Sequence, residues 1–255
     1  MKKEVEKFTD SAVMEGMVSI RAVLSGGHRR IERVLYDESR EGSHAREIAF
    51  LRHRGEEMGF SVDKATAEEI DSVTVGSSHG GIVALCSERT LPVLTPDDIS
   101  DGGFWVMLEG IEDPYNFGYC LRSLYAAGVD GIIVPPRNWM SAAGVVCRAS
   151  AGAGELFDIF VSDAVSAAQM MKAKGYTVVA ADKSADAVSV YDADVRRPML
   201  LLVGGEKRGN TRAALDIADM TVALDYGRDF PAALSAASAA SVIAFELFRK
   251  GRHEK

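Results

Sequence analysis

Five short apolar runs in the second part of the chain are spaced like the strands of a buried parallel sheet. Each run is apolar over four or five residues, as expected of a strand that is covered on both faces. The runs lie at 104–108, 131–134, 177–181, 199–203 and 220–224. Segments with helical spacing of apolar residues follow at 116–127, 164–173, 212–217 and 231–250. This alternation predicts a three-layer α/β domain over residues 104–255.

The first part of the chain alternates less regularly. Its pattern predicts helices at 13–24 and 44–58, each followed by glycine. Strands are predicted at 31–36, 60–62 and 81–86. Residues 1–90 are therefore expected to form a small α/β domain. Prolines and a glycine pair interrupt residues 91–103, which are expected to be an interdomain linker.

Composition narrows the class of protein. The 255 residues carry a net charge of −8, with 47% hydrophobic and 26% charged residues, which is typical of a globular protein. Both halves are acidic, so RNA or DNA would not be held by bulk charge, only by local basic clusters. The three cysteines form no C-x-x-C pair, and no metal site is expected. The sequence shows no segment typical of a secretory leader and no apolar run of about 20 residues that could span a membrane. We therefore expect a cytoplasmic protein.

The first candidate motif, residues 112–123, follows the first strand of the second domain and opens a helix. Polar side chains at the carboxyl end of such a strand lie where open α/β sheets bind ligands. Asn116 has two interpretations, a simple helix N-cap or a site residue. Arg122 lies in an otherwise apolar stretch of this helix, where it is either a solvated side chain or a functional one.

The second motif is a glycine-rich turn, residues 204–211, directly after a buried strand. Glycines let the backbone approach a ligand closely. The spacing resembles a P-loop, but Asn210 occupies the position of the phosphate-binding lysine, which argues against a nucleoside triphosphatase. No strand is followed by G-x-G-x-x-G, so a dinucleotide site is not indicated.

The third motif is the segment 224–227, followed by a run of small residues at 232–241. Small side chains let a helix pack closely against a neighbour, and serines in such a helix bond back to their own backbone.

In this order and spacing the three motifs resemble the SpoU/TrmH branch of the SPOUT RNA ribose methyltransferases. The family's N-x-G-x-x-x-R is matched by Asn116, Gly118 and Arg122. Its G-x-E-x-x-G is matched by Gly204, Glu206 and Gly209.

The resemblance implies a fold and a reaction. The second domain would be a SPOUT domain with a trefoil knot, one of the rare exceptions to unknotted topology. The protein would be a homodimer in which each site is completed by the partner chain. It would transfer a methyl group from S-adenosylmethionine to a ribose 2′-hydroxyl of structured RNA, either ribosomal or transfer RNA. DNA and membranes are not expected partners.

The resemblance also implies site residues by position. The cofactor would contact Val203, Gly204, Gly205, Gly209, Leu224 and Leu234. Catalysis would involve Asn116, Arg122, Glu206 and Ser235. A guanidinium has a pKa above about 12, so Arg122 would bind phosphate and stabilise the developing alkoxide instead of taking up the proton. Glu206 would orient Arg122 or Asn116 through a charge-assisted hydrogen bond.

The third motif departs from the family pattern. Ser235 stands where the family has asparagine, and a hydroxyl offers fewer hydrogen-bond donors than an amide. This departure motivates an alternative function, that of a non-catalytic RNA-binding relative that keeps the knotted fold.

The first domain looks like the family's RNA-binding domain, with residues 78–84 at its end. A basic cluster around Gly26 and Gly27 is expected to contact RNA phosphates. Its members are Arg21, His28, Arg29, Arg30 and Arg33.

Overall fold

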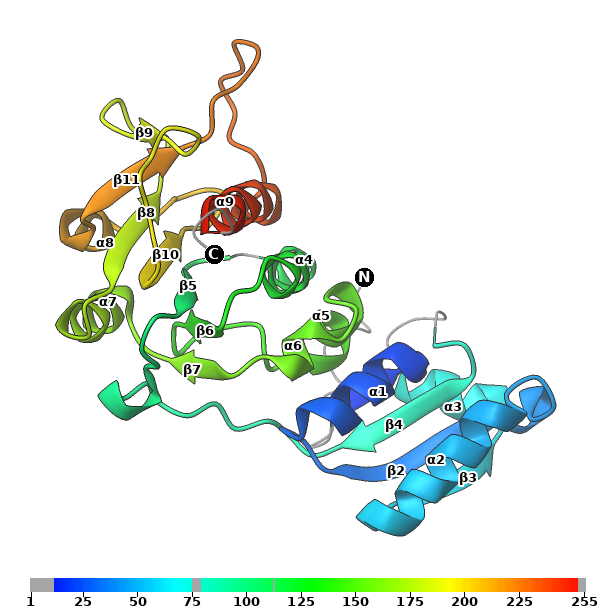
Figure 1. The fold of residues 1–255 in the computed structure, drawn as a ribbon. Helices are drawn as coiled ribbons and strands as arrows, with labels where there is room; N and C mark the ends of the chain where they lie inside the picture. The colour runs from blue at the N-terminus through cyan, green and yellow to red at the C-terminus, as the bar shows by residue number, and fades with distance from the viewer. Residues whose placement is uncertain (1–11, 75–78, 112, 252–255) are drawn as a thin grey trace. The chain divides into compact units, whose positions relative to one another are not determined.

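A computed structural model describes residues 12–74, 79–111 and 113–251. Glu112 of the first motif and Ser78 of the expected RNA-binding domain lie outside these ranges. The chain divides into two compact units, shown in Figure 1. The first comprises Met1–Thr90 and Met140–Leu156, and the second comprises Leu91–Trp139 and Phe157–Lys255. A short segment between two strands of the second unit therefore packs in the first, while the division into RNA-binding domain, linker and methyltransferase domain stays a prediction.

The first unit contains a four-stranded sheet in the order β1-β4-β2-β3. Strands β2 and β3 are parallel, and the other neighbours are antiparallel. The strands are β1 (Ala12–Glu15), β2 (Ile31–Asp37), β3 (Ser61–Ala65) and β4 (Ile82–Cys86). The helices are α1 (Gly16–Gly26), the 3₁₀ turn η1 (Glu38–Arg40), α2 (Ala45–Met58), α3 (Ala67–Val73), α5 (Ala143–Ala149) and α6 (Ala153–Leu156).

Glycines end α1 and α2 as the sequence predicted. Gly27 and Gly59 have φ angles of +70° and +80°, in the left-handed region that favours glycine. The predicted start of the first helix at residue 13 was wrong. Residues 12–15 pair instead with β4, so tertiary pairing overrides the local helical spacing there.

The second unit contains a seven-stranded sheet in the order β7-β6-β5-β10-β8-β11-β9, and all its neighbouring strands are parallel. The strands are β5 (Phe104–Leu108), β6 (Gly131–Val134), β7 (Ile159–Val161), β8 (Thr177–Ala181), β9 (Val188–Ser189), β10 (Met199–Val203) and β11 (Met220–Ala223). The helices are η2 (Pro96–Asp98), α4 (Pro114–Ala126), α7 (Ala164–Ala173), α8 (Arg212–Ile217) and α9 (Ala236–Gly251).

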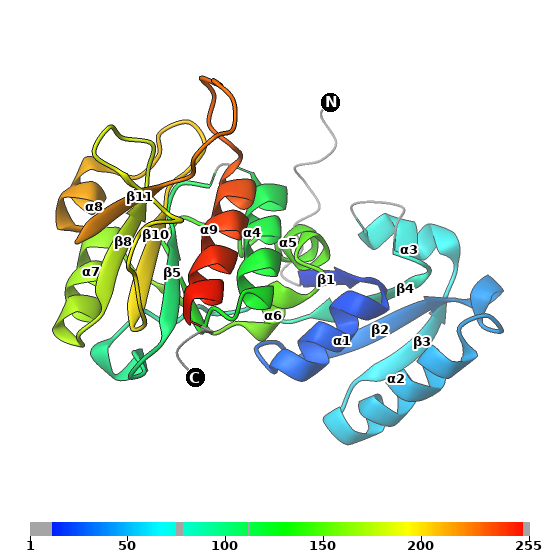
Figure 2. The same ribbon diagram turned by 45° about the horizontal axis from the view of Figure 1, so that its top comes forward.

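Helices cover both faces of this sheet. Figure 2 shows α7 and α8 on one face and α4 and α9 on the other. Every residue of β5 and β10 is buried, as expected of central strands between two helical layers. The predicted three-layer α/β class is confirmed, and the trefoil knot stays a prediction. Among the described residues, no helix is long and apolar enough to cross a membrane.

The topology fixes where a ligand site can form. In a parallel sheet the carboxyl ends of all strands meet at one edge, and the loops that follow them meet there too. The loops after β5, β10 and β11 carry the three motifs. The last helix was predicted from residue 231, but it begins at Ala236, so residues 224–235 form a long approach to α9 at this edge.

Candidate active site

Asn116 and Glu206 are joined at the carboxyl edge of the sheet. The side-chain amide Nδ2 of Asn116 donates a hydrogen bond of 3.0 Å to Oε1 of Glu206. Asn116 is not the N-cap of α4, because Asp113 caps that helix by accepting from the backbone N–H groups of Tyr115 and Asn116. The amide of Asn116 therefore remains available for the turn that follows β10.

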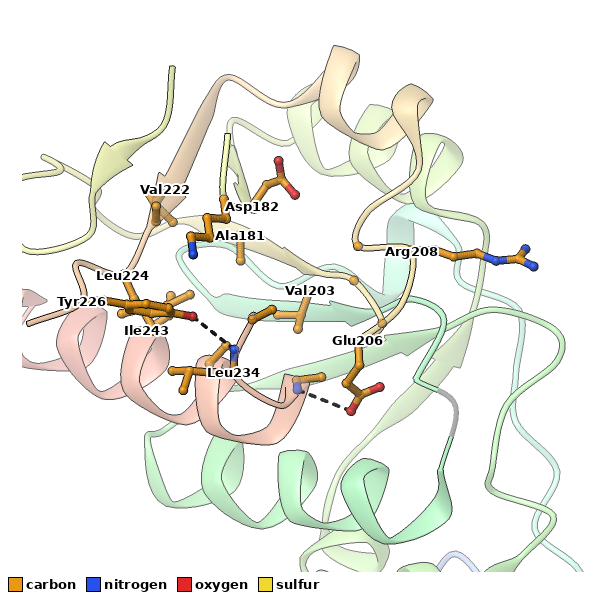
Figure 3. A pocket seen from close by; sticks show the side chains of 18 residues that line it. Ala181, Asp182, Val203, Glu206, Arg208, Val222, Leu224, Tyr226, Leu234 and Ile243 are labelled. Atoms are coloured by element: carbon orange, nitrogen blue, oxygen red, sulfur yellow. Dashed lines mark hydrogen bonds between the residues drawn. The ribbon is translucent and has the colours of Figure 1, made fainter. Parts of the chain in front are cut away.

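Glu206 also contacts the first residue of α9. The same Oε1 atom accepts the backbone N–H of Ala236 at 3.4 Å, a contact drawn in Figure 3. A carboxylate is stabilised at this place by the positive end of the helix dipole. One half-buried carboxylate thus connects all three sequence motifs.

Ser235 caps α9. Its hydroxyl accepts the backbone N–H of Ser238 at 3.2 Å and lies 3.0 Å from the hydroxyl of Ser238. Its carbonyl accepts the backbone N–H of Ala239 at 2.9 Å. The structure therefore shows a local capping role for this hydroxyl, and the catalytic role stays a prediction.

Arg122 lies apart from the Asn116–Glu206 pair. Six residues along an α-helix correspond to a rise of about 9 Å and a rotation that leaves the two side chains about 120° apart. Arg122 is exposed, and within the described part of the chain its guanidinium has no ion pair or hydrogen bond. Two partners were expected for Glu206, Arg122 and Asn116. The carboxylate contacts Asn116 and not Arg122.

A cavity of about 270 Å³ opens beside Glu206, at the ends of β8, β10 and β11. All six residues expected to contact the cofactor line it, namely Val203, Gly204, Gly205, Gly209, Leu224 and Leu234. Figure 3 shows the apolar side chains of this wall together with Ile243 of α9. The lining combines apolar side chains with the glycine backbone of the turn after β10.

The glycines of the turn are required by close backbone contacts. A Cβ atom on Gly204 would lie 2.1 Å from the carbonyl carbon of Gly209, and one on Gly205 would lie 1.9 Å from the carbonyl oxygen of Gly110. Asn210, at the position of a P-loop lysine, is buried and donates to the last carbonyl of β8 at 2.7 Å. The turn is therefore folded against the sheet, and its glycine backbone lines the cavity.

Lys183 and Tyr226 are among the polar residues of the cavity wall that sequence reasoning missed. The backbone N–H of Leu234 donates to the hydroxyl of Tyr226 at 3.1 Å. The ammonium of Lys183 lies 4.6 Å from the centre of the Tyr226 ring and donates to the carbonyl of Phe230 at 3.0 Å. Both were detectable in principle, because Lys183 follows a strand end and Tyr226 lies within the third motif.

These features fit the cofactor that the resemblance implies. An adenosyl group needs an apolar slot with backbone hydrogen-bonding groups, and the amino and sulfonium groups of its methionyl part favour a nearby carboxylate. The cavity provides the slot, and Asp182 and Glu206 line it. Among the described residues, no cluster of side chains is suited to hold a metal ion.

Cys120 lies behind the site but is not a nucleophile. Burial raises the pKa of its thiol to about 12, and the negative charge of Glu206 adds to this effect. The thiol is thus neutral at physiological pH and acts as a small apolar side chain of α4.

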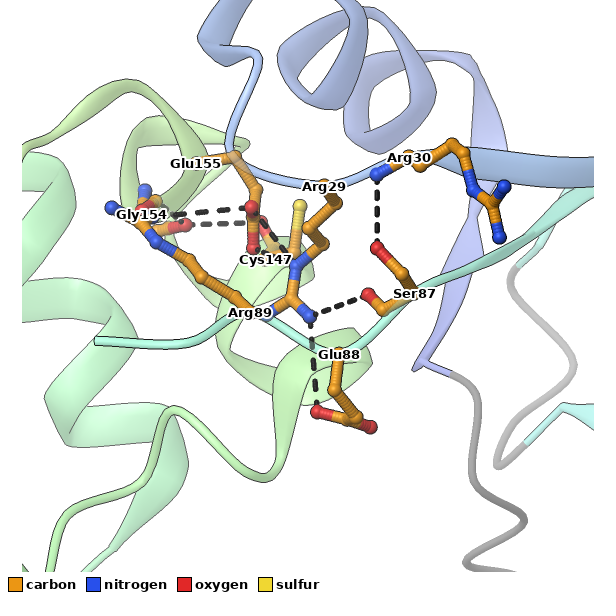
Figure 4. A network of polar contacts seen from close by, with 9 residues as sticks. Arg29, Arg30, Ser87, Glu88, Arg89, Cys147, Gly154 and Glu155 are labelled. Atoms are coloured by element: carbon orange, nitrogen blue, oxygen red, sulfur yellow. Dashed lines mark hydrogen bonds and ion pairs between the residues drawn. The ribbon is translucent and has the colours of Figure 1, made fainter. Parts of the chain in front are cut away.

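Arg29 was wrongly expected to contact RNA. Its side chain is fully buried, and its Nε lies 3.0 Å from both carboxylate oxygens of Glu155. Nη1 donates to the carbonyl of Ser87 at 3.1 Å (Figure 4). The guanidinium therefore holds α6 to the chain after β4 and cannot reach a phosphate.

The other members of that cluster are also engaged, although they are more exposed than Arg29. Arg30 lies 3.4 Å from Glu32, and Arg33 lies 2.7 Å from Asp63. The pKa of Asp63 is held below its ordinary value by the Ser61 hydroxyl and by Arg33. Arg21 stacks 4.4 Å above the ring of Phe50, and His28 is half-buried. Their contact with RNA stays a prediction.

The fold and the cavity together define an α/β protein with a candidate ligand site at the carboxyl edge of its parallel sheet. The model of the SpoU rRNA Methylase family matches residues 103–245, which is more than half of the chain. This protein therefore belongs to the SpoU rRNA Methylase family, and the resemblance seen in its motifs is confirmed.

Relatives align over nearly the whole chain. The 23S rRNA (guanosine-2′-O-)-methyltransferase RlmB of Shewanella oneidensis is 27% identical over 247 residues, covering 94% of this chain and 98% of that protein. The SpoU methyltransferase AviRb of Streptomyces viridochromogenes, solved with AdoMet, has a TM-score of 0.79 at 23% identity and covers 96% of this chain and 91% of that one. The AdoMet-bound rRNA methyltransferase of Sinorhizobium meliloti has a TM-score of 0.77 at 24% identity and covers 94% and 88%.

Proposed function

We propose that this protein transfers a methyl group from S-adenosylmethionine to a ribose 2′-hydroxyl of structured RNA, and that the RNA is ribosomal. One observation carries the proposal: Glu206 joins Asn116 of α4 to the start of α9 beside a cavity walled by glycine backbone. Family membership and the relative that acts on 23S rRNA support it. They also argue against the non-catalytic alternative. A ribosomal substrate in turn supports the cytoplasm as the place of action.

The residues of the chain have distinct tasks in this reaction. The cofactor supplies an electrophilic methyl group on a positively charged sulfur. The turn residues Gly204, Gly205 and Gly209 would offer backbone groups to the adenosyl moiety, and Leu224 and Leu234 would provide apolar contacts to it. Glu206 fixes Asn116 and the start of α9, so the hydrogen-bonding groups around the methyl position keep one arrangement.

Arg122 supplies positive charge without acting as a base. A guanidinium stays protonated at any physiological pH. We assign it contact with the phosphate beside the target ribose and with the negative charge that develops on the 2′-oxygen. This oxygen bonds to the methyl carbon as the bond between that carbon and the sulfur breaks, and the hydroxyl proton is released to water. Because Arg122 lies almost two helical turns from Asn116 on α4 and does not contact Glu206, we assign this role to Arg122 of the partner subunit.

A homodimer is supported by exposed apolar side chains on α4 and α9. Tyr119 and Tyr125 of α4 are about half exposed, as is Phe245 of α9. These two helices contact each other on one face of the sheet, so the exposed side chains form a surface that a second copy would cover. Analytical ultracentrifugation of the protein and of a Phe245→Glu variant tests this. A monomeric wild-type protein would contradict the dimer.

Two measurements test the enzyme against the non-catalytic alternative. The protein is incubated with S-adenosylmethionine labelled in its methyl group and with RNA from cells that lack the protein, and its cofactor affinity is measured by calorimetry. Labelled RNA supports the enzyme. Cofactor binding without transfer to any RNA would support the binder instead, and absence of both cofactor binding and RNA binding would overturn both.

A further inference from the structure

The arginines of the described chain fall into two groups. Most hold a carboxylate, a carbonyl oxygen or an aromatic ring, as Arg29 and Arg33 do in the first unit. Five of those in the described ranges have no such contact, namely Arg46, Arg122, Arg137, Arg208 and Arg228. All five are exposed.

Three of these arginines follow strands of the seven-stranded sheet. Arg137 comes three residues after β6, Arg208 five residues after β10 and Arg228 five residues after β11. Since the strands are parallel, these positions lie at the carboxyl edge, where Glu206 and the cofactor cavity also lie. The strand order places β6 and β11 on opposite sides of the central pair β5 and β10.

Three of the carboxylates at this edge are engaged by neutral donors. Asp113 accepts from the backbone of α4, Glu206 accepts from Asn116 and Ala236, and Asp225 accepts from the hydroxyl of Ser189. The guanidiniums of Arg137, Arg208 and Arg228 form no ion pair with these carboxylates, unlike those of Arg29 and Arg33 in the first unit. Asp182 and Asp229 also lie at this edge, so the arginines are separate positive points and not a broad basic surface.

Two of these side chains border the cofactor cavity or the hollow beside it, and the third lies on a loop at the same edge of the sheet. Arg208 borders the cavity, but its guanidinium extends away from it, as Figure 3 shows. Arg228 lines a second, adjoining hollow with Tyr226 and Phe230. The loop of Arg137 is anchored by the Trp139 indole N–H, which donates to the carbonyl of Ile111 at 2.7 Å. These guanidiniums would meet a ligand that lies across the mouth, and not the cofactor inside.

We infer that Arg137, Arg208 and Arg228 form a rim that binds phosphodiester groups of the substrate RNA on either side of the target nucleotide. The inference rests on the proposed function. Guanidiniums bind phosphate oxygens in a two-pronged geometry, and such contacts position a nucleic acid without reading its sequence. A few separate contacts also suit a protein whose net charge is −8.

The test uses 23S ribosomal RNA transcribed in vitro. Its affinity for the wild-type protein and for the variants Arg137→Ala, Arg208→Ala and Arg228→Ala is measured over a series of salt concentrations. Each variant is expected to bind RNA severalfold more weakly and to reduce the slope of log affinity against log salt by about 1. Cofactor affinity, measured by calorimetry without RNA, is expected to stay unchanged. The KM for RNA rises, while kcat at saturating RNA is kept.

Arg196→Ala is the matched control. Arg196 is exposed in the same unit, but it precedes β10 at the opposite edge of the sheet and is paired with Asp194. Wild-type salt slopes in all three rim variants, or equal losses in Arg196→Ala, would overturn the rim while leaving the proposed function intact. If the unchanged protein neither binds nor methylates RNA, both the rim and the proposed function fail.

Discussion

The amide of Asn116 donates to the carboxylate of Glu206 at 3.0 Å, across 90 positions of the sequence. This bond ties the helix after β5 to the turn after β10, and the same carboxylate reaches the first residue of α9. Three segments that are separate in the chain thereby share one charged group at the mouth of the cofactor cavity. The family motifs are distant in sequence because the sheet brings strand ends together.

Loss of the amide should impair catalysis more than cofactor binding. In Asn116→Ala the carboxylate of Glu206 keeps only its contact to Ala236, so the arrangement around the methyl group loosens. We expect kcat to fall by about 10²-fold, in the range found when one preorganised hydrogen bond is removed, and cofactor affinity to change much less. Steady-state kinetics and calorimetry measure both. The control is Tyr115→Phe, an exposed neighbour on α4. Equal losses in kcat and in cofactor affinity would contradict this role.

Arg122→Ala should abolish methyl transfer while cofactor binding survives. If the site uses Arg122 of the partner subunit, mixing inactive Arg122→Ala with inactive Glu206→Gln should restore activity. In a two-fold symmetric dimer formed at random, about a quarter of the sites would then hold both wild-type groups. Methyl transfer by the mixture, compared with each variant alone, measures this. Retained activity of Arg122→Ala itself would refute its assignment, and an inactive mixture would place Arg122 in its own chain's site.

The Tyr226 hydroxyl should contribute to cofactor binding because its hydrogen bond fixes Leu234 in the cavity wall. Tyr226→Phe keeps the ring beside Lys183 but removes the acceptor for the Leu234 N–H. A hydrogen bond of this kind contributes about 1 kcal/mol, so cofactor affinity should fall by about fivefold. Isothermal calorimetry gives the value, with Tyr191→Phe, an exposed tyrosine outside the cavity, as the control. Tighter binding in Tyr226→Phe would show that the hydroxyl must move aside for the cofactor.

The buried pair of Arg29 and Glu155 should matter for stability. Removing one partner of a buried ion pair leaves the other charge uncompensated, at a cost of about 3 kcal/mol. Glu155→Gln is therefore expected to lower the midpoint of urea unfolding strongly. Arg30→Ala, which alters an exposed arginine next to Arg29, should change the free energy of unfolding by less than about 0.5 kcal/mol. Similar free energies of unfolding for Glu155→Gln and Arg30→Ala would mean that the ion pair does not stabilise the packing of α6.

The three cysteines should be unreactive in the folded protein. Burial raises the pKa values of Cys86, Cys120 and Cys147 from the ordinary 9.0 to about 12. At pH 8 a thiol reagent should label them only in urea. Between pH 9 and 12 the unfolded chain loses thiol protons that the folded chain retains, so the free energy of unfolding should fall as pH rises through that window. Rapid labelling without urea would contradict this.

The buried strands of the second unit could be predicted because their signal is local. Strands at 104–108, 131–134, 177–181 and 199–203 have the predicted limits, since a strand covered on both faces must be apolar throughout. Shorter elements gave no such signal. Strand β9 has two residues, and α5 and α6 are short helices that pack against β1 and α1, which are distant in sequence.

The site was predictable where the backbone itself is constrained. The glycines at 204, 205 and 209 are fixed by close contacts and stand at recognisable spacing. The burial of Arg29 was not predictable, because its partner Glu155 lies 126 positions away and a basic cluster beside a glycine turn is typical of an exposed phosphate site. The capping role of Ser235 became visible only with the true start of α9.

The central claim is methyl transfer to a ribose 2′-oxygen of RNA. The most direct measurement is mass spectrometry of nucleosides from ribosomal RNA of cells lacking the protein, after incubation with the protein and S-adenosylmethionine. We predict one additional 2′-O-methylated nucleoside, present with wild-type protein and absent with Arg122→Ala. A methyl group on a base, or no methylated nucleoside from an RNA that the protein demonstrably binds, would contradict the account.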